Sequence, residues 1–240
     1  SPYYHIDAFA SELFKGNPAG VCSLESWLPE ATMQAIAREN GLAETAFFIP
    51  TPEGYGIRWF TPDMEMDLCG HATLATAFVI KTYFRKDLDK LVFSSRSGPL
   101  LISFPGDRVE MELPSRPPVP ASLPQTIAES LSLQPKEVLK ARDYVLVYGT
   151  EAEVRGLQVD QALLDRINLD PGGVCVTAPG EACDFVSRFF TPQATILEDA
   201  VTGSAHCSLI PLWSGRLGRQ DLQARQVSRR SGELQCRMLE

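Results

Sequence analysis

The stretch Arg58-Trp59-Phe60-Thr61-Pro62 occurs a second time in this chain as Arg188-Phe189-Phe190-Thr191-Pro192. The two copies lie 130 residues apart in a chain of 240 residues. An apolar segment led by a glycine follows each copy, beginning at Gly70 and at Gly203, with an offset of 133. Two repeats of this length are too few for a solenoid. They predict two similar halves facing each other across a cleft, and such clefts commonly hold small ligands.

The residue patterns around the two copies predict the same order of helices and strands. Apolar residues recur at helical spacing before each copy, and short β-rich runs follow. In the first half we expect helices over 29–41 and 70–84, with strands over 46–49 and 56–60. In the second half we expect helices over 124–133 and 138–142, a further helix within 157–167, and strands over 144–148, 173–177 and 184–190. A last helix begins near Gly203, and Pro211 ends or kinks it.

The helices that begin at Gly70 and Gly203 are too apolar to face solvent, since they contain Val79-Ile80 and Leu209-Ile210. We therefore expect both helices to be buried. The expected fold class is α+β, with two pseudo-symmetric halves that each wrap a mixed sheet around a central apolar helix. A proline-dense segment over 114–124 is typical of a stiff connector. It predicts domains at residues 1–116 and 117–240.

Composition and charge narrow the class of partner. A net charge of −8 and a pI near 5.0 argue against nucleic acid, whose phosphates require a basic face. No apolar run reaches the roughly 18 to 20 residues that cross a bilayer, so no membrane partner is expected. A hydrophobic content of 44% with 22% charged residues is ordinary for a soluble globular protein.

The cysteines and histidines suggest neither disulfides nor a metal. The six cysteines form no CxxC pair, which favours reduced thiols and a cytoplasmic location. His5, His71 and His206 share no HxxxH or HExxH spacing, so we expect no metal site.

The two glycine-led helix starts are the strongest candidates for ligand binding. A helix N-terminus offers unpaired backbone N–H groups and the positive end of the helix dipole, and both favour a carboxylate or phosphate. Small residues at Gly70 and Gly203 would let such a ligand approach the backbone closely. Pseudo-symmetry would direct both helix starts at one cleft, where Gly70 and Gly203 would bind a substrate anion.

Four motifs in order along nearly the whole chain resemble the phenazine-biosynthesis PhzF-like isomerases. They are Gly16-Asn17-Pro18-Ala19-Gly20, Asn40-Gly41-Leu42-Ala43-Glu44-Thr45, Leu68-Cys69-Gly70-His71-Ala72-Thr73 and Glu198-Asp199-Ala200-Val201-Thr202-Gly203-Ser204.

The resemblance implies the two-half diaminopimelate epimerase-like fold and a cofactor-free isomerase, often a homodimer, with its site between the halves. Glu44 matches the position of the family's acid/base. His71, Asp199 and Ser204 match its supporting polar residues. The family's C-terminal strands are not found before Glu240, so we expect the C-terminal half to be truncated.

Glu44 also stands out without that likeness. At the 130 offset its counterpart is Val174, so an acid stands in one half only. It precedes the apolar run Thr45-Ala46-Phe47-Phe48, an unusual place for a charge intended only for solvent. An apolar wall disfavours the charged form of a carboxyl group, and this suits a general acid/base.

Cys69 is the competing candidate for the base. Diaminopimelate epimerase and its relatives use two thiols, one in each half, and Cys69 stands directly before its helix glycine. The partner position at an offset of 133 is Thr202, and a hydroxyl is a poor general base. We therefore expect Cys69 to be a small packed residue.

The sequence thus predicts a cofactor-independent isomerase that acts on a small carboxylate-bearing metabolite by a proton shift through Glu44. His71, Asp199 and Ser204 would orient the substrate and stabilise developing charge. Asn17, in its Gly-Pro turn, serves either the turn itself or the ligand. Two alternatives remain: a two-base amino-acid racemase or epimerase, and a catalytically silent small-molecule binding protein.

Overall fold

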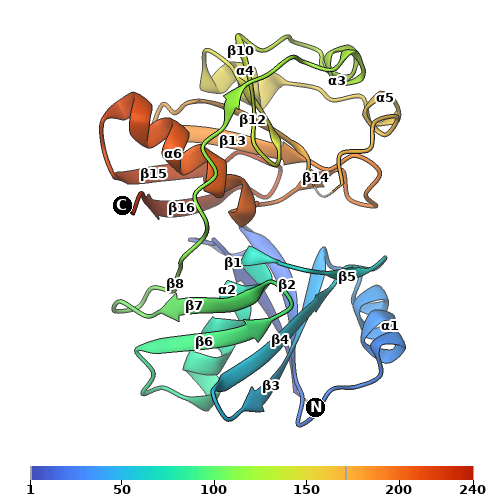
Figure 1. Cartoon of the computed structure of the whole chain (residues 1–240), viewed down its shortest axis with the longest axis vertical. Helices are drawn as coiled ribbons and strands as arrows, with labels where there is room; N and C mark the ends of the chain where they lie inside the picture. The colour runs from blue at the N-terminus through green and yellow to red at the C-terminus, as the bar shows by residue number, and fades with distance from the viewer. Residues whose placement is uncertain (1, 171, 240) are drawn as a thin grey trace. The chain divides into compact units, whose positions relative to one another are not determined.

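The computed structural model describes residues 2–170 and 172–239 and divides into two compact units (Figure 1). The first unit contains the described residues up to Ala8 together with Asn17–Leu113. The second contains Phe9–Gly16 and the described residues from Pro114 onward. The linker expected at 116/117 lies close to the division at 113/114, and no sequence pattern indicated that 9–16 belongs to the second unit.

The first unit is a mixed sheet with two helices. Its strands run in the order β1-β2-β3-β4-β6-β7-β8, with β5 paired to β4. The elements are β1 (Tyr3–Ala8), β2 (Asn17–Ser23), α1 (Glu30–Asn40), β3 (Glu44–Thr51), β4 (Gly54–Phe60), β5 (Glu65–Met66), α2 (Gly70–Val79), the π-helical turn η1 (Ile80–Phe84), β6 (Lys90–Ser95), β7 (Gly98–Ser103) and β8 (Glu110–Met111).

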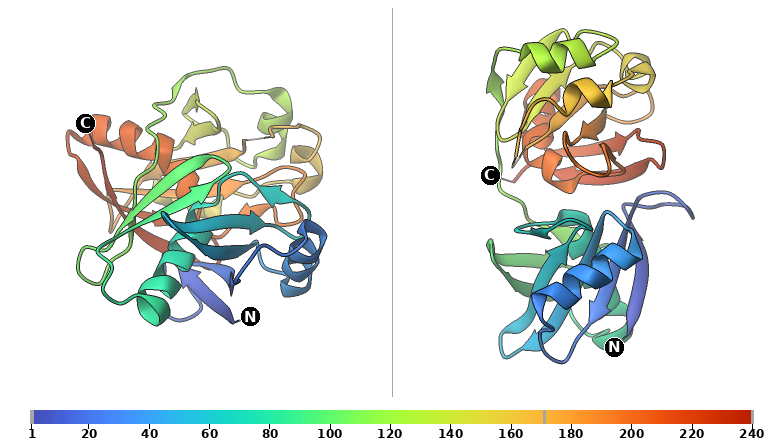
Figure 2. Two further views of the ribbon diagram at one scale, coloured as in Figure 1. Left: turned by 60° about the horizontal axis from the view of Figure 1, so that its bottom comes forward. Right: turned by 90° about the vertical axis from the view of Figure 1, so that its right-hand side faces the viewer.

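Strand alternation separates two apolar layers in this unit. Ala46 and Phe48 of β3 face the cluster that contains α2, whereas Phe47 between them joins the cluster that contains α1. Successive side chains of a strand point to opposite faces, so α1 and α2 cover opposite sides of the sheet. Figure 2 shows α1 lying across the strands of this unit.

The second unit repeats the arrangement. Its strand order is β9-β10-β11-β12-β13-β15-β16, with β14 paired to β13. The elements are β9 (Val119–Pro120), α3 (Gln125–Ser130), β10 (Glu137–Lys140), β11 (Tyr144–Val147), α4 (Glu151–Gly156), α5 (Gln161–Leu164), β12 (Val174–Pro179), β13 (Phe185–Phe190), β14 (Glu198–Asp199), the 3-10 turn η2 (Gly203–Ala205), α6 (His206–Leu217), β15 (Asp221–Gln226) and β16 (Gly232–Arg237).

Six strand pairings of the first unit have a counterpart in the second, whereas the edge pairs β7·β8 and β9·β10 each occur in one unit alone among the described residues. The pairs β1·β2, β3·β4, β4·β5 and β6·β7 are antiparallel, and so are β10·β11, β12·β13, β13·β14 and β15·β16. The pairs β2·β3 and β4·β6 are parallel, as are β11·β12 and β13·β15. The predicted α+β fold with two pseudo-symmetric halves is therefore confirmed.

The repeated arginine forms the same ion pair in each unit. Arg58 Nε donates to Glu65 Oε1 at 2.6 Å, and Arg188 Nε donates to Glu198 Oε1 at 2.7 Å. In both pairs Nη2 donates to the second carboxylate oxygen. Bidentate arginine–carboxylate pairs fix geometry as well as adding energy. They hold β5 and β14 against β4 and β13 and so set the start of each central helix.

The segment Phe9–Gly16 is tied to the second unit by its backbone. Gly16 N donates to Ser231 O at 2.7 Å, and Glu233 N donates to Phe9 O at 3.0 Å. The ring of Phe9 packs against the apolar cluster beside α6. The loop between β1 and β2 is thus a part of the second core.

One local prediction was wrong. Residues 138–142, expected as a helix, lie mostly in β10, which pairs with β11 and β9. Of the two outcomes expected at Pro211, an end or a kink, the structure excludes the end, since α6 continues to Leu217. Proline removes the N–H that would reach the carbonyl of Cys207, and Arg116 N donates to that carbonyl at 2.8 Å instead.

The described helices are all too short or too polar to cross a membrane.

Candidate active site

Glu44 is the first residue of β3, and its side chain is 17% exposed. Parallel pairing sets it beside Ala19 of β2, so Asn17 at the start of β2 lies nearby. His71 is the second residue of α2 and is buried. Its Nε2 lies 3.2 Å from Glu44 Oε2. The start of a strand and the start of the central helix therefore bring an acid and an imidazole together.

Contacts on the other ring nitrogen define the tautomer of His71. Nδ1 lies 3.3 Å from Asn17 Nδ2 and 3.5 Å from Cys69 Sγ. An amide nitrogen only donates, so Nδ1 is the acceptor and the ring proton is on Nε2. That proton is on the side of Glu44, although the N–H is not aligned for a hydrogen bond with Oε2. Catalytic contacts of this kind often tighten only when substrate binds.

Burial keeps His71 neutral. Desolvation lowers the pKa of His71 from 6.5 to about 4. At neutral pH the imidazole can therefore donate one N–H without carrying a charge.

Cys69 is the residue directly before α2, and it is buried. The hydroxyl of Thr73 donates to the carbonyl of Cys69 at 2.6 Å. In the second unit, Thr202 precedes η2, and His206 Nδ1 donates to the carbonyl of Thr202 at 2.9 Å. Cys69 and Thr202 therefore occupy matching positions, as the sequence offset indicated.

The hydroxyl of Thr202 is engaged by an acid. Thr202 Oγ1 donates to Asp199 Oδ2 at 2.6 Å. Gln226 secures the same turn, since its Oε1 accepts from Thr202 N at 2.8 Å and its Nε2 donates to Asp199 O at 2.8 Å. Asp199 is thereby held at the end of β14, beside the start of the second central helix.

Ser204 contacts an arginine that the sequence did not single out. Arg142 Nη2 donates to Ser204 Oγ at 3.0 Å and to Asp143 Oδ2 at 2.8 Å. The side chain of Asp143 is 3% exposed and also accepts from Gly173 N at 2.9 Å. The sequence feature that could have indicated Arg142 is the charged dipeptide Arg142-Asp143, which directly precedes the apolar strand β11.

Each unit thus gathers its own share of the predicted site residues. Glu44, His71 and Asn17 lie together in the first unit, with Gly70 beginning α2. Asp199, Ser204 and Gly203 lie at the corresponding turn of the second unit.

One set of side chains can accommodate a metal ion. Ligand atoms of Glu44, Cys69 and His71 lie within 4.8 Å of one another. The sequence argument considered histidine spacing alone, and three ligands from β3 and the start of α2 have no such signature. The absence of a resident metal stays a prediction.

A comparison with solved structures identifies the class of fold. A predicted epimerase from Pseudomonas aeruginosa has the same fold, with a TM-score of 0.69, 22% identity, and coverage of 97% of this chain and 90% of that chain. The two matching sheets, each around a central helix, are thus an epimerase-like fold.

The family follows from closer relatives. The model of the phenazine biosynthesis-like protein family matches residues 6–240. An uncharacterised isomerase of Pseudomonas aeruginosa is 46% identical over 233 residues, which cover 97% of this chain and 89% of the relative. A PhzF family protein of Enterococcus faecalis superposes with a TM-score of 0.94 at 46% identity, covering 99% of this chain and 91% of that one. The chain belongs to the phenazine biosynthesis-like PhzF family and is an isomerase, as the four motifs predicted.

Proposed function

We propose that this protein is a cofactor-independent isomerase of a small carboxylate-bearing metabolite and that Glu44 carries the proton. The contact of Glu44 Oε2 with His71 Nε2 at 3.2 Å is the observation that supports it most directly. Glu44 takes a proton from a carbon of the substrate and returns it to another position of the same molecule, so no co-reactant is required.

The other site residues hold the substrate and the charge that develops on it. His71 offers one neutral N–H, and Asn17 and Cys69 keep that proton on Nε2. Asp199 and Ser204 orient the substrate from the second unit. The backbone at Gly70 and Gly203 binds its carboxylate, because helix starts favour anions.

We further propose that the protein is a homodimer, as the family resemblance implies. A cytoplasmic location is in keeping with the six cysteines, none of which forms a disulfide in the described part of the chain. Light scattering during gel filtration tests the dimer.

A metabolite screen followed by an isomerisation assay tests the function. Carboxylate metabolites that raise the thermal unfolding midpoint would be incubated with the enzyme and examined by NMR for an isomer. Glu44→Gln keeps the shape and most hydrogen-bonding capacity of the side chain but cannot titrate. It should bind the same ligands with similar affinity and lose roughly 10² to 10⁴ in turnover, the span of a deleted general acid/base.

The outcomes separate the alternatives. Ligands that bind and are recovered unaltered would indicate a silent binding protein. Near-wild-type turnover by Glu44→Gln would remove Glu44 from the mechanism and favour a two-base enzyme that uses Cys69.

A further inference from the structure

Arg142 lies two residues before β11 and is bound by its neighbour Asp143. Its Nε donates to Asp143 Oδ1 at 3.1 Å, and its Nη2 donates to Asp143 Oδ2 at 2.8 Å. Asp143 is buried and anchored by Gly173 N, whereas 26% of the Arg142 side chain is exposed. Because a buried carboxylate binds one edge of the planar guanidinium, the remaining N–H groups are held in a fixed direction for a ligand.

Some N–H groups of Arg142 remain available to a ligand. A guanidinium has five N–H donors and no acceptor. The groups at Nε and Nη2 are used by Asp143 and Ser204, and Nη1 has no partner among the described residues. Because Arg142 can only donate, Ser204 Oγ is the acceptor in their contact, and the hydroxyl proton of Ser204 stays available. Arg142 and Ser204 therefore offer N–H and O–H donors to a ligand, and the guanidinium adds a positive charge.

The repeat relates this pair to the contact between Asn17 and His71 in the first unit. Strand register makes Arg142 equivalent to Pro18, the residue after Asn17. Ser204 is equivalent to His71 by the 133 offset. In the first unit Asn17 contacts His71, and in the second Arg142 contacts Ser204. The same corner of the fold thus carries the acid and imidazole in one unit and a cation in the other.

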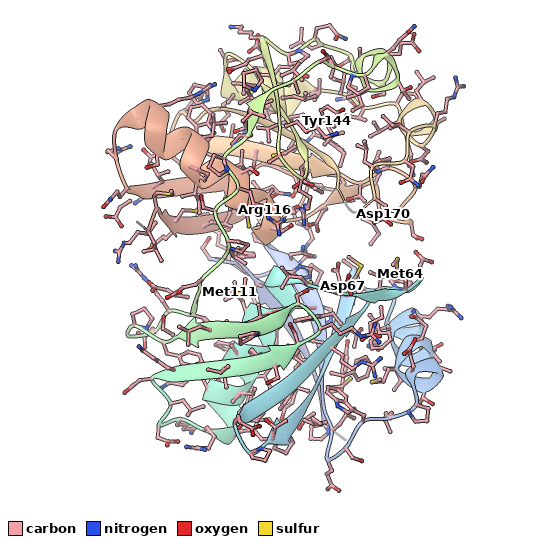
Figure 3. All side chains as sticks on the ribbon, viewed as in Figure 1. Met64, Asp67, Met111, Arg116, Tyr144 and Asp170 are labelled. Carbon is pink, nitrogen blue, oxygen red and sulfur yellow. The ribbon has the colours of Figure 1, made fainter. Side chains whose placement is uncertain are left out.

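Arg116 supplies a second positive charge near this site, and Asp143 forms no ion pair with it. Its backbone N–H is bound to Cys207 O at 2.8 Å, in the first turn of α6, and Figure 3 labels it there. No ion pair of its guanidinium occurs within residues 2–170 and 172–239. Burial raises the pKa of the Cys207 thiol, while the positive charges of Arg116 and Arg142 act to lower it. Both guanidinium groups are therefore within electrostatic range of this turn.

We propose that Arg142 and Ser204, with the charge of Arg116, form an anion subsite that selects substrates with an ionised carboxylate over their neutral amides. The inference rests on the proposed function and adds to it the residue that determines specificity. An ionised carboxylate accepts hydrogen bonds through both oxygens and carries the charge opposite to that of the arginines, whereas a carboxamide is neutral and replaces one acceptor oxygen with an NH₂ donor.

Benzoate and benzamide test this, since they have similar shape and differ in charge. Each would be titrated into ¹⁵N-labelled protein at constant ionic strength, with the Ser204 amide and the Arg142 Nε–H as reporters. We expect saturable shifts with benzoate and an affinity for benzamide that is at least about tenfold weaker. The double variant Arg142→Met/Asp143→Asn avoids a buried unpaired carboxylate, and it should lose about tenfold or more in benzoate affinity with no change for benzamide.

Two further variants keep the test decisive. Arg116→Met leaves Asp143 untouched and should weaken benzoate binding several-fold even if the double variant fails to fold. Arg166→Met removes an exposed arginine of the same unit and should bind benzoate as the wild type does. Equal affinity for the two probes, no saturable shift, or unchanged benzoate binding in the folded Arg142 variant would overturn the subsite.

Failure of the subsite is distinguishable from failure of the proposed function. Glu44→Gln lies in the other unit and should bind benzoate normally. Loss of turnover in that variant without a benzoate site would leave the isomerase intact and remove this inference alone.

Discussion

Glu44 and Gly173 occupy the same position in the two sheets. The residue after each, Thr45 and Val174, pairs with the last residue of the neighbouring strand. Sequence spacing had assigned Val174 as the counterpart of Glu44, so that assignment was wrong by one residue. The inference drawn from it stands, since neither Val174 nor Gly173 is an acid.

Gly173 cannot take a side chain without a rearrangement. A Cβ there would lie 2.6 Å from Cζ of Phe189 and 2.7 Å from the carbonyl oxygen of Phe190. Gly173→Ala should therefore destabilise the protein by roughly 1–3 kcal/mol, the usual effect of overpacking. Urea unfolding measures it. Gly215→Ala is the control, because Gly215 lies in α6 with open space around its Cβ position, and it should be neutral or stabilising by up to about 1 kcal/mol. Equal effects of the two substitutions would contradict the packing argument.

The presence of an acid at the Glu44 position, and of glycine at the equivalent position of the second unit, predicts partial internal return of the substrate proton. A single carboxyl group that shuttles the proton can return it before exchange with solvent, whereas a second base delivers a proton from water. In D₂O, mass spectrometry of product from an early stage of the reaction should therefore find a fraction without deuterium at the new C–H position. Complete deuteration at every stage would favour the two-base alternative.

Cys69 should be dispensable for turnover. Its matching residue Thr202 has a hydroxyl in place of a thiol and donates the hydroxyl proton to Asp199 at 2.6 Å, so the matching position supplies no second thiol base. Cys69→Ala should retain most of the wild-type kcat once a substrate is known. A decrease in kcat of roughly 10² or more, similar to that of a deleted general base, would favour the two-base epimerase instead.

The repeat made the architecture predictable from the sequence. Arg58 and Arg188 mark equivalent strands, and the change of offset from 130 to 133 arises because the turn before β14 is three residues longer than the turn before β5. Local patterns were less reliable where tertiary contacts decide the outcome. The backbone of Arg116 compensates for Pro211, and no local rule anticipates that bond.

The candidate site was predictable only in part for the same reason. Glu44 and His71 stand in motifs, and their contact could be expected. Arg142 becomes a neighbour of Ser204 only when β11 lies beside the start of α6, across 62 residues of sequence. The pair has no signature in sequence spacing, so a single sequence could not identify it.

Added zinc should bind at Glu44, Cys69 and His71 and inhibit the enzyme, although turnover should not require it. The ligand atoms lie within 4.8 Å of one another, and small side-chain movements bring them to tetrahedral spacing. Dialysis against EDTA should leave turnover unchanged, because Glu44 needs free oxygens to move a proton. Calorimetry should detect one zinc site whose affinity falls at least about tenfold in Cys69→Ala. Loss of turnover with EDTA, restored by zinc, would contradict the prediction of no resident metal.

His206 should make the stability of the fold depend on pH. Burial lowers its pKa from 6.5 to about 4 in the folded protein, where its ring lies 5.9 Å from that of Phe185. Between these values the unfolded chain binds a proton that the folded protein does not, so the free energy of unfolding should rise from pH 4 to 6.5 and level off above it. The contribution of His206 across this window is about 3 kcal/mol.

The substitution His206→Thr isolates that contribution. Thr73, at the matching position of α2, donates to the carbonyl four residues earlier, as His206 Nδ1 does, so threonine keeps this bond and removes the titrating ring. The variant should be less stable at pH 7 because a buried ring is lost, yet its stability should fall by roughly 2–3 kcal/mol less than the wild type's between pH 6.5 and 4. Part of the slope should remain, since burial lowers the pKa of His71 in the same direction. Urea unfolding of both proteins at half-unit steps of pH measures the difference, and parallel pH profiles would show that His206 does not titrate differently in the folded and unfolded states.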